Sequence, residues 1–379
     1  GDIDVDGTTN LDIVDVDGAV NFAADVTFAD GADIITASAG NNNVRVGINA
    51  GNSIQSGGNQ NTVVGDEAGT AITTGIENVF IGHLTGDALT DADFNVAVGR
   101  AALSTDTLGS KSTAIGQGTL NGQNFTTATD SLNTAVGFFA GLSVTTGVEN
   151  TLIGSLAGDA LTDADFNVAV GASALSLDTL GSKTTAIGLG ALQNQNFGTA
   201  TDTHNVAVGF QAGHDVTSGN KNTLIGSLTG DAITNGDNNV AVGHLALSGD
   251  TLGEKSVAIG TFSLLAQNFT TLTDSFNTAV GHASGTALTT GLENTLIGAL
   301  AGDALTDADL NVVVGTSALT DDTLGSRSIA IGYKALEKQN FTTATDTYNT
   351  AVGHAAGNKI TTGIQNTLIG GRAGDALTD

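Results

Sequence analysis

The stretch N-T-A-V-G-F-F-A-G, residues 133–141, decides the fold because near copies of it recur along most of the chain. Residues 167–175 read N-V-A-V-G-A-S-A-L, and nineteen such motifs lie between residues 43 and 370. We call the first glycine of each motif the strand glycine, and from Gly65 onward its positions cycle through 17-, 17-, 17- and 21-residue steps. Four coil types therefore alternate in fixed order, in a 72-residue super-repeat that maps Gly65 onto Gly137 and Gly209.

The pattern inside each motif predicts one short strand per repeat. The residue before the strand glycine is Val or Ile in all nineteen motifs, and the third residue before it is Thr, Val or Ile. Alternate β-branched residues favour a strand. The third residue after the glycine is always Ala, Thr or Ser, which indicates a tight corner facing inward. A strand, a glycine turn and a small corner residue within one such short step predict one turn of an all-β parallel solenoid.

Composition supports a thin repetitive core. The chain of 379 residues has 53 Gly, 4% aromatic residues and no Pro, Cys, Met or Trp, so large core side chains are scarce. Hydrophobic residues still reach 40%, which is too apolar for a disordered linker. We therefore expect an irregular β fibre segment over residues 1–42, followed by a solenoid shaft of about nineteen coils over residues 43–379.

Charge and motif content argue against several function classes. The net charge of −28 opposes binding to nucleic acid or to anionic lipid heads. No apolar run reaches the roughly 18 residues that a membrane helix needs, so we expect no membrane insertion in this segment. There is no nucleophile elbow, Walker loop, paired cysteine or histidine-rich metal motif. We expect a non-enzymatic protein without a catalytic site or a cofactor.

The second residue before each strand glycine is also apolar, with Arg45 as the exception. A strand that is apolar on both faces is normally buried on both faces. Taking the Val or Ile next to the glycine, such as Val170 and Val242, as the interior residue, we expect the second position to face outward. It is then a self-association face suited to a homotrimer, or, alternatively, the mildly apolar outside of a lone solenoid. The predicted face contains Ala135, Leu152, Ala169, Ala186, Ala207, Leu224, Ala241 and Ala258.

An asparagine stands at the fourth position before the strand glycine in the first three coil types, as at Asn61, Asn78 and Asn95, and serine replaces it in the fourth type, as at Ser112. Stacked asparagine side chains can hydrogen-bond from coil to coil and cap the turn that enters the strand. We expect this column to be structural.

The second coil type carries acidic loops of the form G-D-A-L-T-D-A-D. Oxygen-rich loops suit calcium, but Asx turns with solvated carboxylates are the simpler interpretation, and Asn235 interrupts the pattern in one copy. The calcium candidates are Asp87, Asp91, Asp93, Asp159, Asp163, Asp165, Asp303, Asp307 and Asp309.

Two further features recur once in every super-repeat. The third coil type reads D-T-L-G-S-K, which predicts an ion pair closing the loop between Asp106 and Lys111 and its later copies. The extra residues of the 21-residue coils follow a phenylalanine, found at Phe125 and at the equivalent position of each later super-repeat. We expect these rings to fold over the solenoid wall or clasp a neighbouring chain, rather than to contact another partner.

The motif resembles two families of fibrous proteins. N-T-A-V-G-F-F-A-G and N-V-A-V-G-A-S-A-L resemble the head repeats of YadA-type trimeric autotransporter adhesins, in which an N-S-V-A-I-G pattern builds a left-handed parallel β-roll. Residues 150–158 and 349–363 look still more like repeats of bacteriophage tail fibres, particularly marine ones, and the opening D-V-D-G-T-T-N at residues 4–10 fits them. The long 17- and 21-residue coils and the strict four-coil super-repeat depart from the adhesin pattern.

These resemblances imply a left-handed winding of the solenoid and a structural fibre shaft that spans distance and supports attachment to a host surface, located in a virion or outside a cell. Its partners would be two further copies of the chain and a host receptor that binds outside this segment. An extracellular bacterial adhesin or surface filament is the alternative. A solenoid polysaccharide lyase ranks third, because the groove of aromatic and charged residues that it needs is missing from the sequence.

Overall fold

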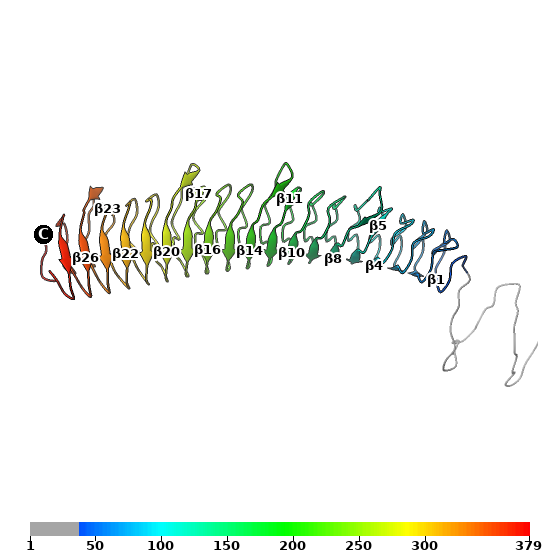
Figure 1. Ribbon diagram of the computed structural model, residues 1–379, viewed down its shortest axis with the longest axis horizontal. Helices are drawn as coiled ribbons and strands as arrows, with labels where there is room; N and C mark the ends of the chain where they lie inside the picture. The colour runs from blue at the N-terminus through cyan, green and yellow to red at the C-terminus, as the bar shows by residue number, and fades with distance from the viewer. Residues whose placement is uncertain (1–37) are drawn as a thin grey trace, which may run out of the picture. The chain divides into compact units, whose positions relative to one another are not determined.

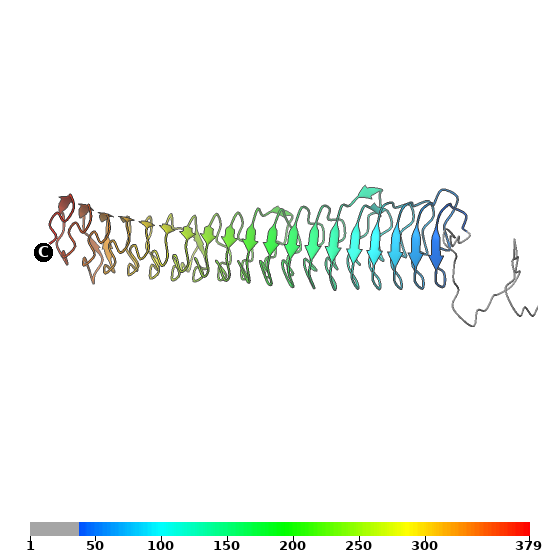
Figure 2. The ribbon, with the colours of Figure 1, turned by 90° about the horizontal axis from the view of Figure 1, so that it is seen from below.

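The computed structural model describes residues 38–379, and over these residues the chain is an all-β solenoid of about nineteen stacked coils without a helix. Figure 1 shows one strand per coil in a single ladder, and the view turned by 90° shows the same strands in one continuous file (Figure 2). The predicted fold class is therefore confirmed. The left-handed winding stays a prediction, and residues 1–37 of the predicted irregular segment lie outside the described residues.

Nineteen three-residue strands form one sheet in which each strand pairs in parallel with the strands of the coils before and after it. Equivalent residues lie side by side, so that Ala169 has Leu152 and Ala186 as its neighbours. The strands are β1 (Val44–Val46), β2 (Thr62–Val64), β3 (Val79–Ile81), β4 (Val96–Val98), β6 (Thr113–Ile115), β8 (Thr134–Val136), β9 (Thr151–Ile153), β10 (Val168–Val170), β12 (Thr185–Ile187), β14 (Val206–Val208), β15 (Thr223–Ile225), β16 (Val240–Val242), β18 (Val257–Ile259), β20 (Thr278–Val280), β21 (Thr295–Ile297), β22 (Val312–Val314), β24 (Ile329–Ile331), β26 (Thr350–Val352) and β27 (Thr367–Ile369).

Four small parallel sheets mark the 21-residue coils. Each one pairs two residues of the third coil type with two residues of the longer fourth type, at loops that project from the ladder at β5, β11, β17 and β23 (Figure 1). The pairs are β5 (Gly109–Ser110) with β7 (Thr129–Asp130), β11 (Gly181–Ser182) with β13 (Thr201–Asp202), β17 (Gly253–Glu254) with β19 (Thr273–Asp274), and β23 (Gly325–Ser326) with β25 (Thr345–Asp346).

The corner after each strand requires glycine. Gly137 has a φ of 145°, and a Cβ atom there would lie 2.3 Å from the carbonyl oxygen of Gly154 in the next coil. Ordinary residues with positive φ occur at three other positions: the second after the strand glycine, the fifth before it and, in the last two coil types, the fourth after it. Examples are Leu156 (φ 58°), Phe166 (φ 60°) and Leu175 (φ 56°). None of the described non-glycine residues with positive φ is Val, Ile or Thr. The exclusion has a steric cause, because β-branched side chains tolerate this backbone region poorly.

The core is a single column whose filling alternates between coil types. In the first two types a glycine stands at the fourth position after the strand glycine, and a buried aliphatic residue such as Leu161 stands at the seventh. In the last two types the fourth position is leucine, as at Leu175 and Leu192, and the seventh position is polar. A Cβ atom on Gly158 would lie 2.8 Å from the Cδ1 of Leu161, so the two arrangements exclude each other.

Candidate functional site

The predicted self-association face lies inside the solenoid. All eight of its residues are 0% exposed in a single chain, and they belong to the hydrophobic core. Their outward orientation was therefore a wrong interpretation, and these side chains cannot contact another chain. The corrected residues are Ala135, Leu152, Ala169, Ala186, Ala207, Leu224, Ala241 and Ala258.

The alternation of the strand was predicted correctly, but its two faces were exchanged. The opposite wall of the interior comes from the same short coil, where the corner residue Ala174 is fully buried, so little depth remains for side chains. Alanine fits this space at most coils, and a leucine such as Leu152 fills it at the second coil type. The bulkier Val170 projects to the outside, where it is only partly buried.

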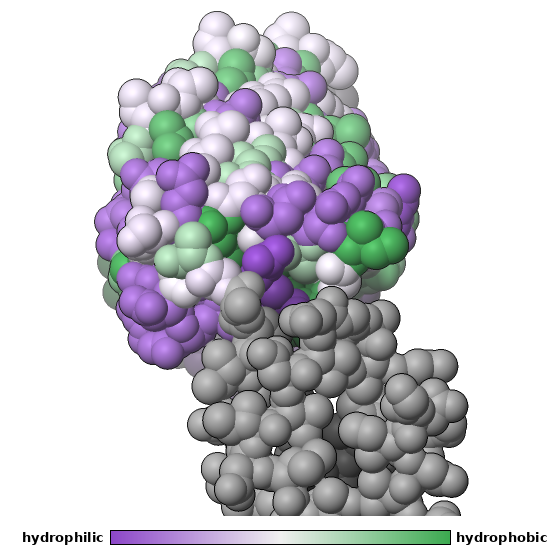
Figure 3. Space-filling model, turned by 90° about the vertical axis from the view of Figure 1, so that its right-hand side faces the viewer, coloured by the Kyte–Doolittle hydropathy of each residue, from purple (hydrophilic) through white to green (hydrophobic). Residues whose placement is uncertain are grey.

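The outward side of the sheet therefore carries the apolar surface. We call it the outer ladder, and it consists of the first and third residues before each strand glycine. Its members are Val or Ile at the first position and Thr, Val or Ile at the third, and they follow the unbroken file of strands in Figure 2. Several are 36–40% exposed, namely Ile81, Ile115, Ile153, Ile187, Ile225, Ile259, Ile297, Val312 and Ile329. In the view onto the β1 end, hydrophobic and hydrophilic residues both reach the surface (Figure 3).

The asparagine column forms the predicted ladder. The backbone N–H of Asn167 donates to Oδ1 of Asn150 at 3.0 Å, and the side-chain amide of Asn167 donates to the carbonyl of Gly181 at 2.9 Å. In the next coil, the backbone N–H of Thr184 donates to Oδ1 of Asn167 at 2.9 Å. Each buried amide thus satisfies groups in two coils, which links the turns by direct hydrogen bonds.

A second buried polar network, which the sequence did not reveal, holds each 21-residue coil. Oδ1 of Asp106 accepts the backbone N–H groups of Gly109 at 3.1 Å and Phe125 at 3.0 Å. Its Oδ2 accepts the side-chain amide of Gln123 at 2.6 Å, and Oε1 of Gln123 accepts the amide of Asn133 at 2.9 Å. The network recurs with Asp178 and Gln195, Asp250 and Gln267, and Asp322 and Gln339, all of them 0% exposed.

The glycine of the D-T-L-G sequence is required by this network. A Cβ atom on Gly109 would lie 2.1 Å from Oδ2 of Asp106, so any larger residue would displace the carboxylate. A recurrent Asp and Gln one coil apart could have signalled the pairing in the sequence, because both occupy the seventh position after a strand glycine.

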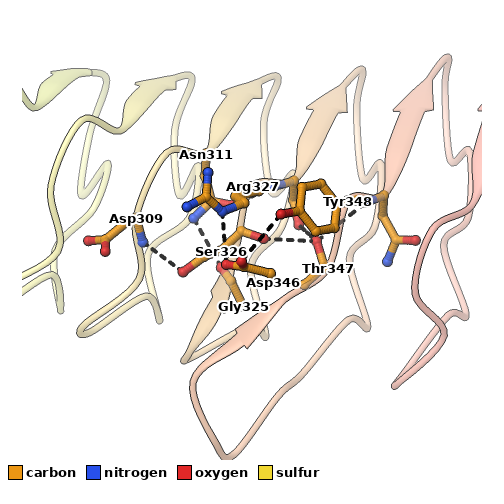
Figure 4. Close-up of polar contacts among 10 residues, drawn as sticks. Asp309, Asn311, Gly325, Ser326, Arg327, Asp346, Thr347 and Tyr348 are labelled. Atoms are coloured by element: carbon orange, nitrogen blue, oxygen red, sulfur yellow. Dashed lines mark hydrogen bonds and ion pairs between the residues drawn. The ribbon is translucent and has the colours of Figure 1, made fainter.

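The predicted ion pair has a different acidic partner. Lys111 pairs with Asp130 of the next coil, whereas Asp106 is buried in the network described above. In the fourth copy, Nε of Arg327 lies 2.9 Å from Oδ1 of Asp346, and the Tyr348 hydroxyl donates to the same carboxylate at 3.3 Å (Figure 4). These pairs lie at the surface, where such interactions contribute little stability.

The recurrent phenylalanines close over the solenoid, which was one of the two structural arrangements expected for them. Phe125, Phe197, Phe269 and Phe341 are 5–7% exposed. The rings are covered by their own chain and leave little surface for a partner.

The acidic loops do not gather their carboxylates. Oδ1 of Asp163 accepts the Thr146 hydroxyl at 2.7 Å, and Oδ1 of Asp165 accepts the backbone N–H of Val148 at 2.8 Å, both from the preceding coil. Oδ1 of Asp159 is buried without a hydrogen-bond partner. Within residues 38–379, no group of three or more acidic or histidine side chains is placed to hold a metal ion. The geometry therefore favours the turn-forming interpretation of these loops over calcium binding.

Burial raises the pKa of the first aspartate in each of these loops, at Asp87, Asp159, Asp231 and Asp303. Ionisation of these aspartates is therefore less favourable in the folded chain than in the unfolded chain. The resulting loss of folding stability is fully present above the raised pKa. This loss of stability disappears as the pH falls from the raised pKa toward 3.8, the ordinary pKa of an aspartate.

We expect the combined variant with Asn at these four positions to melt a few degrees higher than the wild type at pH 7. The difference should disappear near pH 4, as measured by circular dichroism. Asp91→Asn and Asp163→Asn are matched controls, because Asn235 occupies the equivalent position naturally. An equal gain at both pH values would show that burial of charge is not the cause.

Comparison with known proteins adds no relative: no family model, curated protein or solved structure matches the chain. The described residues contain no helix of the length and hydrophobicity required to cross a membrane.

Proposed function

We propose that this chain is a non-enzymatic fibre shaft that spans distance and supports attachment to a host surface. The observation that carries the proposal is the unbroken parallel pairing of nineteen strands in which buried amides link coil to coil. A stack of this kind resists bending and separation because every coil is bonded to both neighbours. The buried polar groups hold the solenoid together, because the asparagine column and the Asp–Gln network make their hydrogen bonds within the stack of coils.

The proposed setting is the virion, as part of a tail fibre, in keeping with the resemblance of the repeats to phage fibre proteins. An antibody against residues 43–379 should then label fibres that project from virus particles. Labelling of a bacterial surface instead would favour the alternative, an extracellular adhesin or filament.

We further propose that the shaft is a homotrimer and that the outer ladder is the contact surface. The support is the continuity of this half-exposed apolar strip over all nineteen coils, since small areas add along a seam at about 25 cal/mol per Å². Three chains can enclose such a strip around an axis, as the resemblance to trimeric adhesin heads implies.

Sedimentation equilibrium tests this assembly. The wild type should be a trimer at micromolar concentration, and Val170→Glu with Val242→Glu should give a folded monomer because like charges then face each other across the seam. Leu177→Asp is the control for added charge, since Leu177 is 50% exposed off the outer ladder and Asp321 is its equivalent two super-repeats later. A monomeric wild type, or a trimeric double variant, would rule out this contact surface.

A further inference from the structure

A cavity of about 320 Å³ lies where the super-repeat that begins at Gly281 meets the one that begins at Gly353. It spans three consecutive coils, at the turns that follow the strands β24, β26 and β27. Its volume falls at the lower end of the roughly 300–1,000 Å³ typical of small-molecule sites. The lining includes Tyr333, Lys334, Glu337, His354, Asn358, Lys359, Arg372 and Asp375.

The internal repeats show that the solenoid does not require four of these residues. The positions of Lys334 and Glu337 are occupied by Phe262 and Leu265 in the preceding super-repeat. The position of Lys359 is Ala287 there, and the position of Arg372 is leucine in all four earlier copies, Leu84, Leu156, Leu228 and Leu300. The same backbone corner therefore forms without Lys334, Glu337, Lys359 and Arg372, whereas Asp375 recurs as Asp303 and His354 recurs as His282.

Part of the cavity lining is ordered by contacts within the chain. Nζ of Lys334 lies 2.8 Å from Oε1 of Glu337, and the amide of Asn358 donates to Oε2 of the same carboxylate at 2.6 Å. The hydrogen bond from Lys334 lowers the pKa of Glu337, so the acid is ionised and neutralised by its neighbour. The rings of Tyr333 and His354 lie 5.3 Å apart at an interplanar angle of 31°.

The rest of the lining contains the basic residues Lys359 and Arg372. Within the described residues Lys359 has no ion-pair partner, and Asp375 is the remaining acid of the lining. Three of the eleven basic residues of this strongly acidic chain line the cavity, namely Lys334, Lys359 and Arg372. A guanidinium group binds a carboxylate through two parallel hydrogen bonds, which makes Arg372 suited to a carboxylate ligand.

We propose that this corner binds a small saccharide that bears a carboxylate. Arg372 and Lys359 bind the carboxylate, while Asn358, Asp375 and the Tyr333 hydroxyl offer hydrogen bonds to sugar hydroxyl groups. The half-exposed Tyr333 ring supplies the apolar surface on which the edge of a sugar ring packs. This site does not depend on whether the chain is a fibre shaft, because its residues belong to one chain and lie off the outer ladder.

The chain provides a specific optical probe for this site. It has two tyrosines and no tryptophan, so Tyr348→Phe leaves Tyr333 as the single tyrosine fluorophore. The substitution is a natural one, because Phe276 occupies the equivalent position one super-repeat earlier. Titration of this variant with D-glucuronate should change the Tyr333 fluorescence and saturate, whereas D-glucose and acetate should each bind at least about tenfold more weakly.

The internal repeats also supply variants that preserve the fold. Arg372→Leu and Lys359→Ala restore the residues found at equivalent corners, and each should weaken glucuronate binding about tenfold or more. Lys221→Ala, which removes an exposed lysine elsewhere, should leave binding unchanged. The site is refuted if glucuronate gives no saturable change, if Arg372→Leu binds like the parent, or if acetate binds as tightly as glucuronate.

Discussion

Replacing Ala169 with glutamate is expected to unfold the coils around strand β10. The Ala169 side chain is 0% exposed between Leu152 and Ala186, and no basic side chain belongs to the core around it. A glutamate there would be both too large and without a partner for its charge. Buried unpaired charges and overpacked cores give the largest single-residue losses, so we expect more than about 4 kcal/mol.

Val170→Glu is the matched control for this prediction, because it places the same side chain one residue further along the strand on the outer ladder. Urea unfolding followed by circular dichroism should give a large loss for Ala169→Glu and a small change for Val170→Glu. Both proteins must be measured in the same oligomeric state, because loss of assembly lowers apparent stability by itself. If the two variants lose the same stability, the inward orientation of Ala169 is wrong.

Asp106→Ala is expected to be the second most damaging change, with a loss of about 3 kcal/mol or more, because each unsatisfied buried donor costs about 1–3 kcal/mol. Removing the carboxylate leaves the N–H groups of Gly109 and Phe125 and one of the two amide hydrogens of Gln123 without an acceptor in a buried site. The other amide hydrogen of Gln123 still bonds to Ser112. Because coils contact only their neighbours, the damage should appear as faster amide hydrogen exchange in the third and fourth coil types of the first super-repeat.

An exchange of the two partners separates the hydrogen bond from simple loss of packing. Asp106→Asn alone turns an amide donor toward the Gln123 amide, and Gln123→Glu alone brings two carboxylates together, so each single variant should be destabilised. In the double variant the new amide at position 106 can donate to the new carboxylate at position 123. This variant should therefore recover a large part of the lost stability. Additive losses in the double variant would show that the Asp106–Gln123 contact is not what stabilises this coil.

Much of the fold could be predicted because the period of the repeat is directly visible in the sequence. The regular return of the strand glycine, β-branched residues at alternate positions and a small corner residue together specify a strand and a turn without knowledge of distant contacts. The asparagine column was predictable for the same reason. Equivalent residues in successive coils must stack, and a stacked amide has few alternatives to its neighbours.

The orientation of the strand could not be read from hydrophobicity, because both of its faces are apolar. Val170 is the larger side chain and Ala169 the smaller, and large apolar residues are usually the buried ones. Here the width of the interior decides which face of the strand points inward. A short coil leaves room for alanine inside, so the larger valine lies on the outside. That width depends on the path of the rest of the coil, which the sequence of the strand motif does not specify.

The buried Asp–Gln network was missed because a charged residue next to a glycine turn is usually at the surface. Asp106 stands close to Lys111 in the sequence, which suggested a local pair. In the structure the stacking of coils brings Gln123 beside Asp106 and Asp130 beside Lys111. Contacts between coils thus override contacts along the chain, and the same rule brings the cavity residues from Tyr333 to Asp375 together.

Cryo-electron microscopy of the purified protein tests most directly whether residues 43–379 form one continuous rod. At a strand spacing of about 4.8 Å, nineteen coils give a rod roughly 90 Å long, with the projecting loops of the 21-residue coils repeating about every 19 Å along it. We expect particles with both spacings along a single axis, whatever the number of chains. Particles made of several compact bodies, or rods in which the spacing of about 4.8 Å is interrupted, would contradict a solenoid that serves as a rigid shaft.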